Sequence, residues 1–229
     1  LEPGSKELTA LNYYTNEEIT IPLDPTQTPG ENAQRYFAKY NKQKRTFEAL
    51  TELIQETADD IQYLESISNA LDIALNEADL AQIKEELMQS GYIRRKHTKK
   101  KVKLTSKPMH YISSDGYDMY VGKNNLQNEE LTFSFANGND WWFHAKGAPG
   151  SHVIVKSGGD ELPDRTFEEA GRLAAYYSKN RGADKVEIDY IQKKHVKKPN
   201  GAKPGFVVYY TNYSLVIDSD ISNIKNVQD

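Results

Sequence analysis

Apolar side chains recur with a seven-residue period between residues 36 and 75. One series is interrupted only by Ser68 and comprises Tyr40, Phe47, Ile54, Ile61 and Leu75. A second series, three or four residues away, is interrupted by Gln43 and Thr57 and comprises Tyr36, Leu50, Leu64 and Leu71. This is the spacing of the a and d positions of a coiled coil. Because the stretch contains no Gly or Pro, it predicts one helix about 60 Å long, at about 1.5 Å per residue.

A shorter helix is predicted over roughly residues 78–89, ending before Ser90-Gly91. It is too short to cover the apolar seam of the 36–75 helix. We therefore expect the partner helix to lie outside this fragment or to come from another chain, so that the chain self-associates through the unpaired seam. The alternative is a long amphipathic helix that lies across the globular domain.

The segments on either side of the helical region differ from it in pattern. Upstream, "IPLDPTQTPGEN" carries three prolines and a glycine, which predicts an extended segment rather than a helix. Downstream, few apolar residues occur between 92 and 107, which is typical of a tether. The chain therefore divides into an extended segment (1–30), a coiled-coil helical region (31–91), a basic linker (92–107) and a globular domain (108–229).

Residues 108–229 alternate short strands with one or two helices. Strands are predicted on both sides of Asp115-Gly116, across 140–158 as strand, turn and strand, over 185–192, and in a hairpin over 205–218 that turns at Asn212. Helices are predicted over 124–136, where the two Phe residues also fit a strand, and from 164 to Gly182. The fold class is α+β: a mixed sheet domain with helices packed on it, preceded by a long coiled-coil helix.

The net charge of −4 conceals a strong segregation of charge. Residues 1–30 hold one Lys and five acidic residues, whereas residues 92–107 hold eight Lys or Arg and no acidic residue. The basic run is either a solvated linker or a phosphate-binding segment, whose binding would be independent of sequence and sensitive to salt. Its predicted phosphate contacts are Arg94, Arg95, Lys96, Lys99, Lys100 and Lys101.

Several classes of protein are disfavoured by what the sequence lacks. No run approaches 18 apolar residues, so we expect no membrane span, and the start shows no signal-peptide pattern, although a chain beginning with Leu1 is expected to be a fragment. The absence of Cys excludes disulfides and fits a reducing compartment. Neither GxSxG, GxGxxG, a P-loop nor HExxH is present. We therefore expect no enzyme, no cofactor and no metal.

The stretch "DWWFHAKGAPGSHV" (140–153) concentrates both Trp residues and two of the five His residues around a Pro-Gly turn. A metal site that includes Asp140 is disfavoured because no ligand spacing is fixed. A packed hairpin and an RNA-facing surface both stay open, with Trp141 and Phe143 assigned to the core. If the loop between the two strands has four residues, 147–150, His152 lies on the core face of the hairpin. If the loop has one residue more, His152 lies on the same face as Trp142.

Three motifs, in the same order, resemble the NFACT RNA-binding domain. They are "SSDGYDMYVGKNNLQNEELT", "NDWWFHAKGAPGSHVIV" and "HVKKPNGAKPG". Upstream, "NYYTNEEITIPLDPTQTPGENAQRYFAKYNKQKR" and "YLESISNALDIA…LAQIKEELMQSGYI" resemble the middle coiled-coil region of the same family in Gram-positive bacteria. The resemblance covers nearly the whole chain.

The resemblance implies a cytoplasmic, ribosome-associated quality control role. Members of the family bind the large ribosomal subunit that carries a stalled peptidyl-tRNA, and they recruit tRNA for C-terminal alanine tailing of the nascent chain. Since the tRNA-selecting regions of the family are absent from these residues, we expect the fragment to bind without supporting tailing. Relatives have also been described as cell-surface adhesins for fibronectin and fibrinogen, which is the alternative.

The predicted RNA-binding residues combine aromatic rings for stacking on bases with Lys and His for phosphates. They lie in the three family-like stretches and are Lys123, Asn124, Asn125, Trp142, His144, Lys146, Ser151, His152, Lys193, Lys194, His195, Lys197, Lys198 and Lys203.

Overall fold

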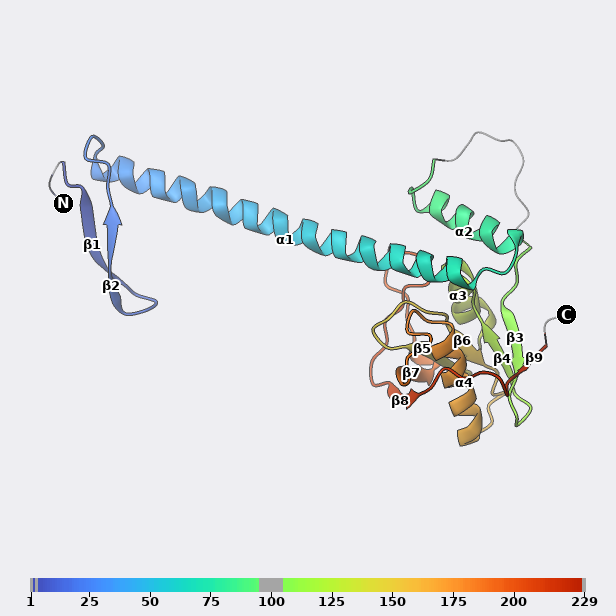
Figure 1. The fold of residues 1–229 in the computed structure, drawn as a ribbon. Coiled ribbons are helices and arrows are strands. Elements are labelled where there is room, and N and C mark those ends of the chain that lie inside the picture. The colour runs from blue at the N-terminus through green and yellow to red at the C-terminus, as the bar shows by residue number, and fades with distance from the viewer. Residues whose placement is uncertain (1, 3, 95–104, 228–229) are drawn as a thin grey trace. The chain divides into compact units, whose positions relative to one another are not determined.

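The computed structural model describes residue 2 and residues 4–94 and 105–227, and it divides the chain into two compact units, residues 1–59 and 60–229 (Figure 1). The long helix α1 (Pro29–Ile73) begins in the first unit and ends in the second. Its 45 residues confirm the predicted long helix. No helix in the described ranges is long and apolar enough to cross a membrane.

The first unit contains a β-hairpin and the start of α1. Strands β1 (Glu7–Asn12) and β2 (Glu17–Pro22) pair in antiparallel fashion. Of the stretch 21–32, which was predicted to be extended, only Ile21 and Pro22 lie in a strand, and Pro29–Asn32 already belong to α1. α1 begins with a capping box, in which the Thr28 N–H and hydroxyl both donate to the Glu31 carboxylate and the Glu31 N–H donates to the Thr28 hydroxyl. Pro29 fits the first helical position because its missing N–H needs no partner there.

The heptad positions of α1 are largely exposed to solvent. Phe47 is 72% and Ile54 is 68% exposed, and Tyr40, Ile61 and Leu71 are also exposed. One face of the helix becomes buried only toward its end, where α2 (Glu77–Gln89) packs on it. There Ile83 of α2 contacts a cluster formed by Tyr63, Ile67 and Ala70 of α1. The short second helix is thus confirmed, capped by the Asn76 side chain, which accepts from the Asp79 N–H.

The second unit is built on a seven-stranded sheet of order β8-β7-β5-β6-β4-β3-β9. The strands are β3 (Met109–Ile112), β4 (Asp118–Val121), β5 (Trp141–Ala145), β6 (Val153–Val155), β7 (Val186–Gln192), β8 (Tyr213–Ile217) and β9 (Lys225–Asn226). The α+β class is confirmed. Every recorded pairing is antiparallel, however, whereas a mixed sheet was predicted.

Both faces of the central strands of this sheet are buried. On one face α4 (Asp164–Tyr176) covers Phe143, Ala145 and Val153. On the other face, Trp142 and Ile154 are covered by the π-helical turn η1 (Leu131–Phe135), which continues α3 (Asn125–Glu130), and by Val196 and Tyr209 from the later loop. The central strands therefore lack a water-facing side, and all three residues of β6 are buried.

Two predicted elements differ in the structure. α4 ends at Tyr176 rather than at Gly182, because the chain turns at Ser178, whose hydroxyl donates to the Ala175 carbonyl and whose backbone bridges to Gly150. The predicted 205–218 hairpin is wrong in its first half. Residues 206–210 form only a bridge from Val208 to Lys197, and Thr211, with φ of 58°, breaks the extended chain before β8.

Replacement of Phe143 by Ala tests the buried centre of the sheet. We expect the Phe143→Ala change to lower the free energy of unfolding by about 3–5 kcal/mol, since a fully buried ring leaves a cavity. Tyr210→Ala is the matched control, because Tyr210 is 74% exposed and its loss is expected to change that free energy by less than about 0.5 kcal/mol. Denaturant unfolding measures both. Equal effects of the two changes would contradict this core assignment.

Candidate nucleic-acid interface

The register of the β5–β6 hairpin is neither of the two predicted. Trp142 pairs with Ile154 and Phe143 with Val153, so the same register extended places His144 opposite His152. The two imidazole rings lie edge to face with their centroids 5.4 Å apart. His152 therefore shares the face of Trp142 and His144, as the longer loop predicted. It is nevertheless buried, as the shorter loop predicted.

Trp142 belongs to the core rather than to the surface. Its side chain is 0% exposed, and its ring centroid lies 5.0 Å from that of Tyr209 and 5.1 Å from that of His152. A base cannot reach this ring, so the predicted stacking on Trp142 is corrected by the structure. Trp141 was assigned to the core and does pack on it, edge-on to Phe167 at 4.8 Å, although it is partly exposed.

Burial favours the neutral form of His152, which is fully buried, and of His144, which is partly buried. Burial lowers the pKa of His144 to about 4, and it lowers the pKa of His152 well below its ordinary value, where the neighbouring His144 adds to the effect. The His152 ring is hydrogen-bonded to the Thr132 hydroxyl at 2.8 Å. Since neither imidazole carries a charge near neutral pH, the predicted attraction of phosphate by these two rings is not supported.

Lys146 and Ser151 also have partners within the domain. Lys146 is exposed at the end of β5 and forms an ion pair with Glu187 of β7. The Ser151 hydroxyl is buried and donates to the Gly122 carbonyl at 2.5 Å. Ser151 thus fixes the chain that follows β4, and of the predicted hairpin contacts Lys146 is the one with an accessible charge.

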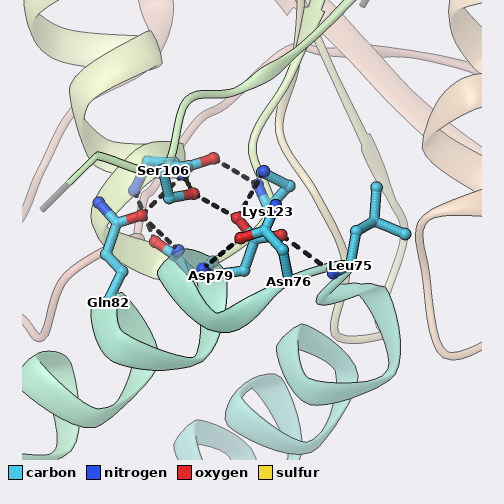
Figure 2. Close-up of polar contacts among 8 residues, drawn as sticks. Leu75, Asn76, Asp79, Gln82, Ser106 and Lys123 are labelled. Atoms are coloured by element: carbon cyan, nitrogen blue, oxygen red, sulfur yellow. Dashed lines mark hydrogen bonds and ion pairs between the residues drawn. The ribbon is translucent and has the colours of Figure 1, made fainter.

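Lys123, Asn124 and Asn125 form a buried polar network, the polar latch, with α2. Figure 2 shows the part of this network around Lys123, Asp79 and Ser106. The Lys123 ammonium lies 2.5 Å from the Asp79 carboxylate, and the two side chains are 5% and 1% exposed. Asp79 also accepts from the Ser106 hydroxyl at 2.5 Å and from the Leu75 N–H at 2.9 Å. Burial alone would raise the pKa of Asp79, but the hydrogen bonds from Lys123 and Ser106 hold it below its ordinary value.

The two asparagines complete the polar latch. The Asn124 side-chain oxygen caps α3 by accepting from the Gln127 N–H, while the Asn124 side-chain nitrogen donates to the side-chain oxygen of Gln82 in α2. The Asn125 amide donates to Glu86 at 2.8 Å and to Ser66 at 2.7 Å. These three predicted RNA contacts therefore face the helices α1 and α2, and none of them is available to a nucleic acid in this structure.

The lysines of the 193–205 loop fall into two groups. Lys203 pairs with Asp60 at 2.5 Å and lies over the rings of Tyr63 and Tyr92, and Lys198 pairs with Glu129 at 2.7 Å. These two ion pairs hold the loop against α1 and α3. In the other group Lys193 is partly exposed, and Lys194, His195 and Lys197 are exposed. Within the described ranges the side chains of Lys194 and Lys197 have no ion-pair partner.

The predicted phosphate contacts of the basic linker lie mostly outside the described residues. Arg94 is exposed, just beyond the turn that follows α2. Arg95, Lys96, Lys99, Lys100 and Lys101 fall outside the described ranges, and their role stays a prediction.

Asp140 organises the surface around the loop and was considered in the sequence only as a metal ligand. Its carboxylate accepts from the Asn137 N–H, the Ser157 N–H and the Lys156 ammonium, and its carbonyl accepts from the Lys193 N–H. No cluster of three metal-binding side chains occurs in the described part of the chain. The Asn-Gly-Asn-Asp sequence at 137–140 was the available signal, since such residues are typical of hydrogen-bonded turns.

Comparison with known proteins assigns this arrangement to a class. Residues 107–211 match the NFACT protein RNA binding domain, and residues 1–106 match the NFACT N-terminal and middle domains. The sheet domain with its lysine-rich loop is therefore an RNA-binding-domain fold attached to a helical region. The chain belongs to the NFACT family.

Individual relatives are similar over nearly all of the chain. The protein named Rqc2 homolog RqcH from Streptococcus pneumoniae is 46% identical over 95% of this chain, and that from Bacillus subtilis is 41% identical over 98%. The chain spans about two fifths of their length, 39% and 40%. The solved C-terminal part of the fibronectin/fibrinogen-binding protein from Streptococcus suis is 43% identical, with a TM-score of 0.78 over 87% of this chain and 80% of that one.

Replacement of Lys123 by Met tests the polar latch. The Lys123→Met change leaves the buried Asp79 carboxylate without its counter-ion, and we expect the free energy of unfolding to fall by about 3–5 kcal/mol. Lys146→Met is the matched control, since its exposed pair with Glu187 is worth less than about 1 kcal/mol. Chemical denaturation measures both. A loss from Lys123→Met as small as that from Lys146→Met would contradict a structural role for the lysine.

The two histidines make stability depend on pH in a defined direction. Unfolded imidazoles titrate near pH 6.5, whereas folded His144 titrates near 4 and His152 well below its ordinary value. Between about pH 4 and 6.5 the unfolded state therefore binds more protons, so the contribution of these residues to stability is lost as the pH falls through this window. Imidazole NMR resonances of His144 and His152 are expected to stay constant from pH 8 to 5.5. A midpoint near 6.5 for either ring would refute this.

Proposed function

We propose that this chain binds RNA on the large ribosomal subunit, as part of a ribosome-associated quality control factor. The observation that carries the proposal is the match of residues 107–211 to an RNA-binding domain whose exposed lysines, Lys194 and Lys197, lie within that same range. Unpaired ammonium groups attract phosphate and release its counterions. The relatives named Rqc2 homolog RqcH support the assignment to quality control.

The wider activity is proposed for the whole protein rather than for these residues. We assign to the whole protein the recruitment of tRNA, the recognition of peptidyl-tRNA and the alanine tailing of stalled chains in the cytoplasm. This chain spans about two fifths of the relatives. We assign it a binding role and no catalytic step, cofactor or metal. The exposed heptad positions of α1 are proposed to contact a partner helix or a second copy of the chain.

A second candidate function is adhesion to fibronectin at the cell surface. It is favoured by one observation, the similarity to the fibronectin/fibrinogen-binding protein from Streptococcus suis at 43% identity. The same exposed charges would serve a protein ligand in that case. The two functions differ in how their affinities depend on salt, because RNA binding releases many counterions from a dense line of phosphates.

Parallel binding measurements across a salt series separate the two functions. We expect the affinity for purified large subunits to fall linearly with salt on a log–log scale. The Lys194→Gln/Lys197→Gln variant is expected to lower that slope by about 1.4–1.8, at about 0.7–0.9 per phosphate. Lys185→Gln/Lys225→Gln is the matched control, because both of its lysines are exposed outside the loop.

The outcomes of this test are distinct. Large-subunit binding with the predicted slope supports the proposal. Micromolar affinity for fibronectin, with no measurable binding to large subunits or tRNA, would reverse the ranking of the two functions. An equal effect of both double variants would show that the loop lysines have no special role.

A further inference from the structure

Aromatic rings and ammonium groups meet on one exposed part of the second unit, which we call the aromatic–lysine patch. It comprises Tyr120 of β4, Phe133 and Phe135 of η1, Lys156 directly after β6, and Lys193 at the start of the 3₁₀ turn η2 (Lys193–His195). Of these five residues only Lys193 was among the predicted RNA contacts, and the aromatic contact expected from the sequence was Trp142. Phe135 is 41% exposed, and the other four are partly buried or half-exposed.

The rings of the aromatic–lysine patch are held in a defined arrangement. The Phe135 and Tyr120 rings form a T-shaped pair with centroids 4.7 Å apart, and the Lys156 ammonium lies 4.8 Å from the Phe135 centroid. Tyr120 in turn stacks on His110, at 4.5 Å and 3° between planes. The Lys193 ammonium lies 5.9 Å from the Phe133 centroid. Such edge-to-face and cation–π contacts limit the motion of an exposed ring.

Asp140 joins two of the four chain segments that supply the aromatic–lysine patch, those of Lys156 and Lys193. Its carboxylate contacts Lys156 at 2.5 Å, its carbonyl accepts from the Lys193 N–H at 2.8 Å, and the neighbouring Gly138 carbonyl accepts from the Lys194 N–H at 3.0 Å. The carboxylate is buried, so these contacts are shielded from water. The backbone at Lys193 and Lys194 is thus fixed to the 138–140 turn, and the Lys156 side chain links that turn to the Phe135 ring.

We propose that the aromatic–lysine patch binds an unpaired nucleotide of single-stranded RNA, with its base stacked on Phe135 and the flanking phosphates near Lys193 and Lys194. This inference rests on the proposed function and locates its contact. Stacking on an aromatic ring is available to every base once it is unpaired, and cations beside the ring neutralise the backbone. A duplex buries its base faces and offers phosphates only.

The charge around the aromatic–lysine patch favours RNA over a protein partner. Lys156 is neutralised by Asp140, and Asp118 is engaged by His110 at 2.7 Å. The ammonium groups of Lys193 and Lys194 are left without an ion-pair partner in the described ranges. A predominantly apolar protein surface would leave these charges uncompensated, whereas an RNA strand supplies one phosphate per nucleotide.

A fluorescence anisotropy titration of the 229-residue chain with a labelled twelve-nucleotide oligouridine tests the proposal. We expect Phe135→Leu to weaken binding by about five- to tenfold, because the branched side chain fills a similar volume without a stacking face. Phe206→Leu is the matched control, since Phe206 is 48% exposed and belongs to a different segment. Binding of an RNA duplex of the same length is expected to be unchanged by Phe135→Leu.

The contribution of charge is measured in the same assay. Lys193→Gln is expected to lower the log–log salt slope by about 0.7, the value for one phosphate of a single strand. Lys185→Gln is the control, since Lys185 is exposed at the opposite end of β7, about 25 Å away at about 3.3 Å per residue. Photocrosslinking with a 4-thiouridine oligonucleotide, mapped by mass spectrometry, is expected to label the peptide that contains residues 133–135. The crosslinking experiment uses the parent chain, so its result does not depend on whether a variant folds.

Each outcome decides between the proposals. RNA binding that is insensitive to Phe135→Leu, with crosslinks elsewhere, overturns the aromatic–lysine patch as the contact and leaves the proposed function intact. Loss of fibronectin binding in Phe135→Leu, with unchanged RNA binding, would make it a protein-binding surface and also overturns the inference. No binding of the parent chain to any RNA refutes the proposed function itself.

Discussion

The buried ion pair between Lys123 and Asp79 is the contact on which the arrangement of the second unit depends. A lysine and an aspartate removed from water are tolerated only when each meets its counter-ion and the remaining lone pairs are satisfied. Ser106 and the Leu75 N–H meet that requirement for Asp79, and the neighbouring asparagines donate hydrogen bonds to Gln82 and Glu86. The connection between β4 and α3 is thereby fixed to the helices that precede the sheet. A stretch with the composition of an RNA-contacting loop instead holds the domain together.

The same separation of roles runs through the basic residues. Lys198 and Lys203 are paired within the second unit, and the Lys203 ammonium also lies over two tyrosine rings. Lys194 and Lys197 are not paired in the described ranges, although they lie in the same loop. The count of positive charges in a loop is therefore a poor measure of what that loop offers to a polyanion. Carboxylates of the same domain neutralise some of the lysines. The backbone of Lys193 and Lys194 is held in place by hydrogen bonds to the Asp140 and Gly138 carbonyls.

The sequence predicted the fold better than it predicted the candidate site, for physical reasons. The heptad spacing, the Asp115-Gly116 turn and the apolar stripe of the 164–176 helix are local signals, and each produced the element expected. Periodicity in β5 could not show that both faces are covered, because the residues that bury Trp142 come from η1 and from the segment around Tyr209, which are distant in sequence. The hairpin register was undetermined for a similar reason, because His152 is hydrogen-bonded to Thr132 of η1, which lies outside the hairpin. Phe133 and Phe135 were ambiguous because a π-helical turn has a period that neither the strand nor the helix pattern describes.

That turn has a consequence for how the domain tolerates changes in length. A π-helical segment accommodates one residue more than an α-helix of the same rise, and such segments are rare and frequently occur at functional sites. Removing one residue from 131–135 would allow regular α-helical hydrogen bonding, and it would rotate everything after the deletion by about 100° around the helix axis. Phe135 would then lose its contacts with Tyr120 and Lys156, although no side chain of the aromatic–lysine patch had been replaced. Among homologous chains, the spacing between Leu131 and Ala136 is thus as informative about this surface as the identity of the residues that form it.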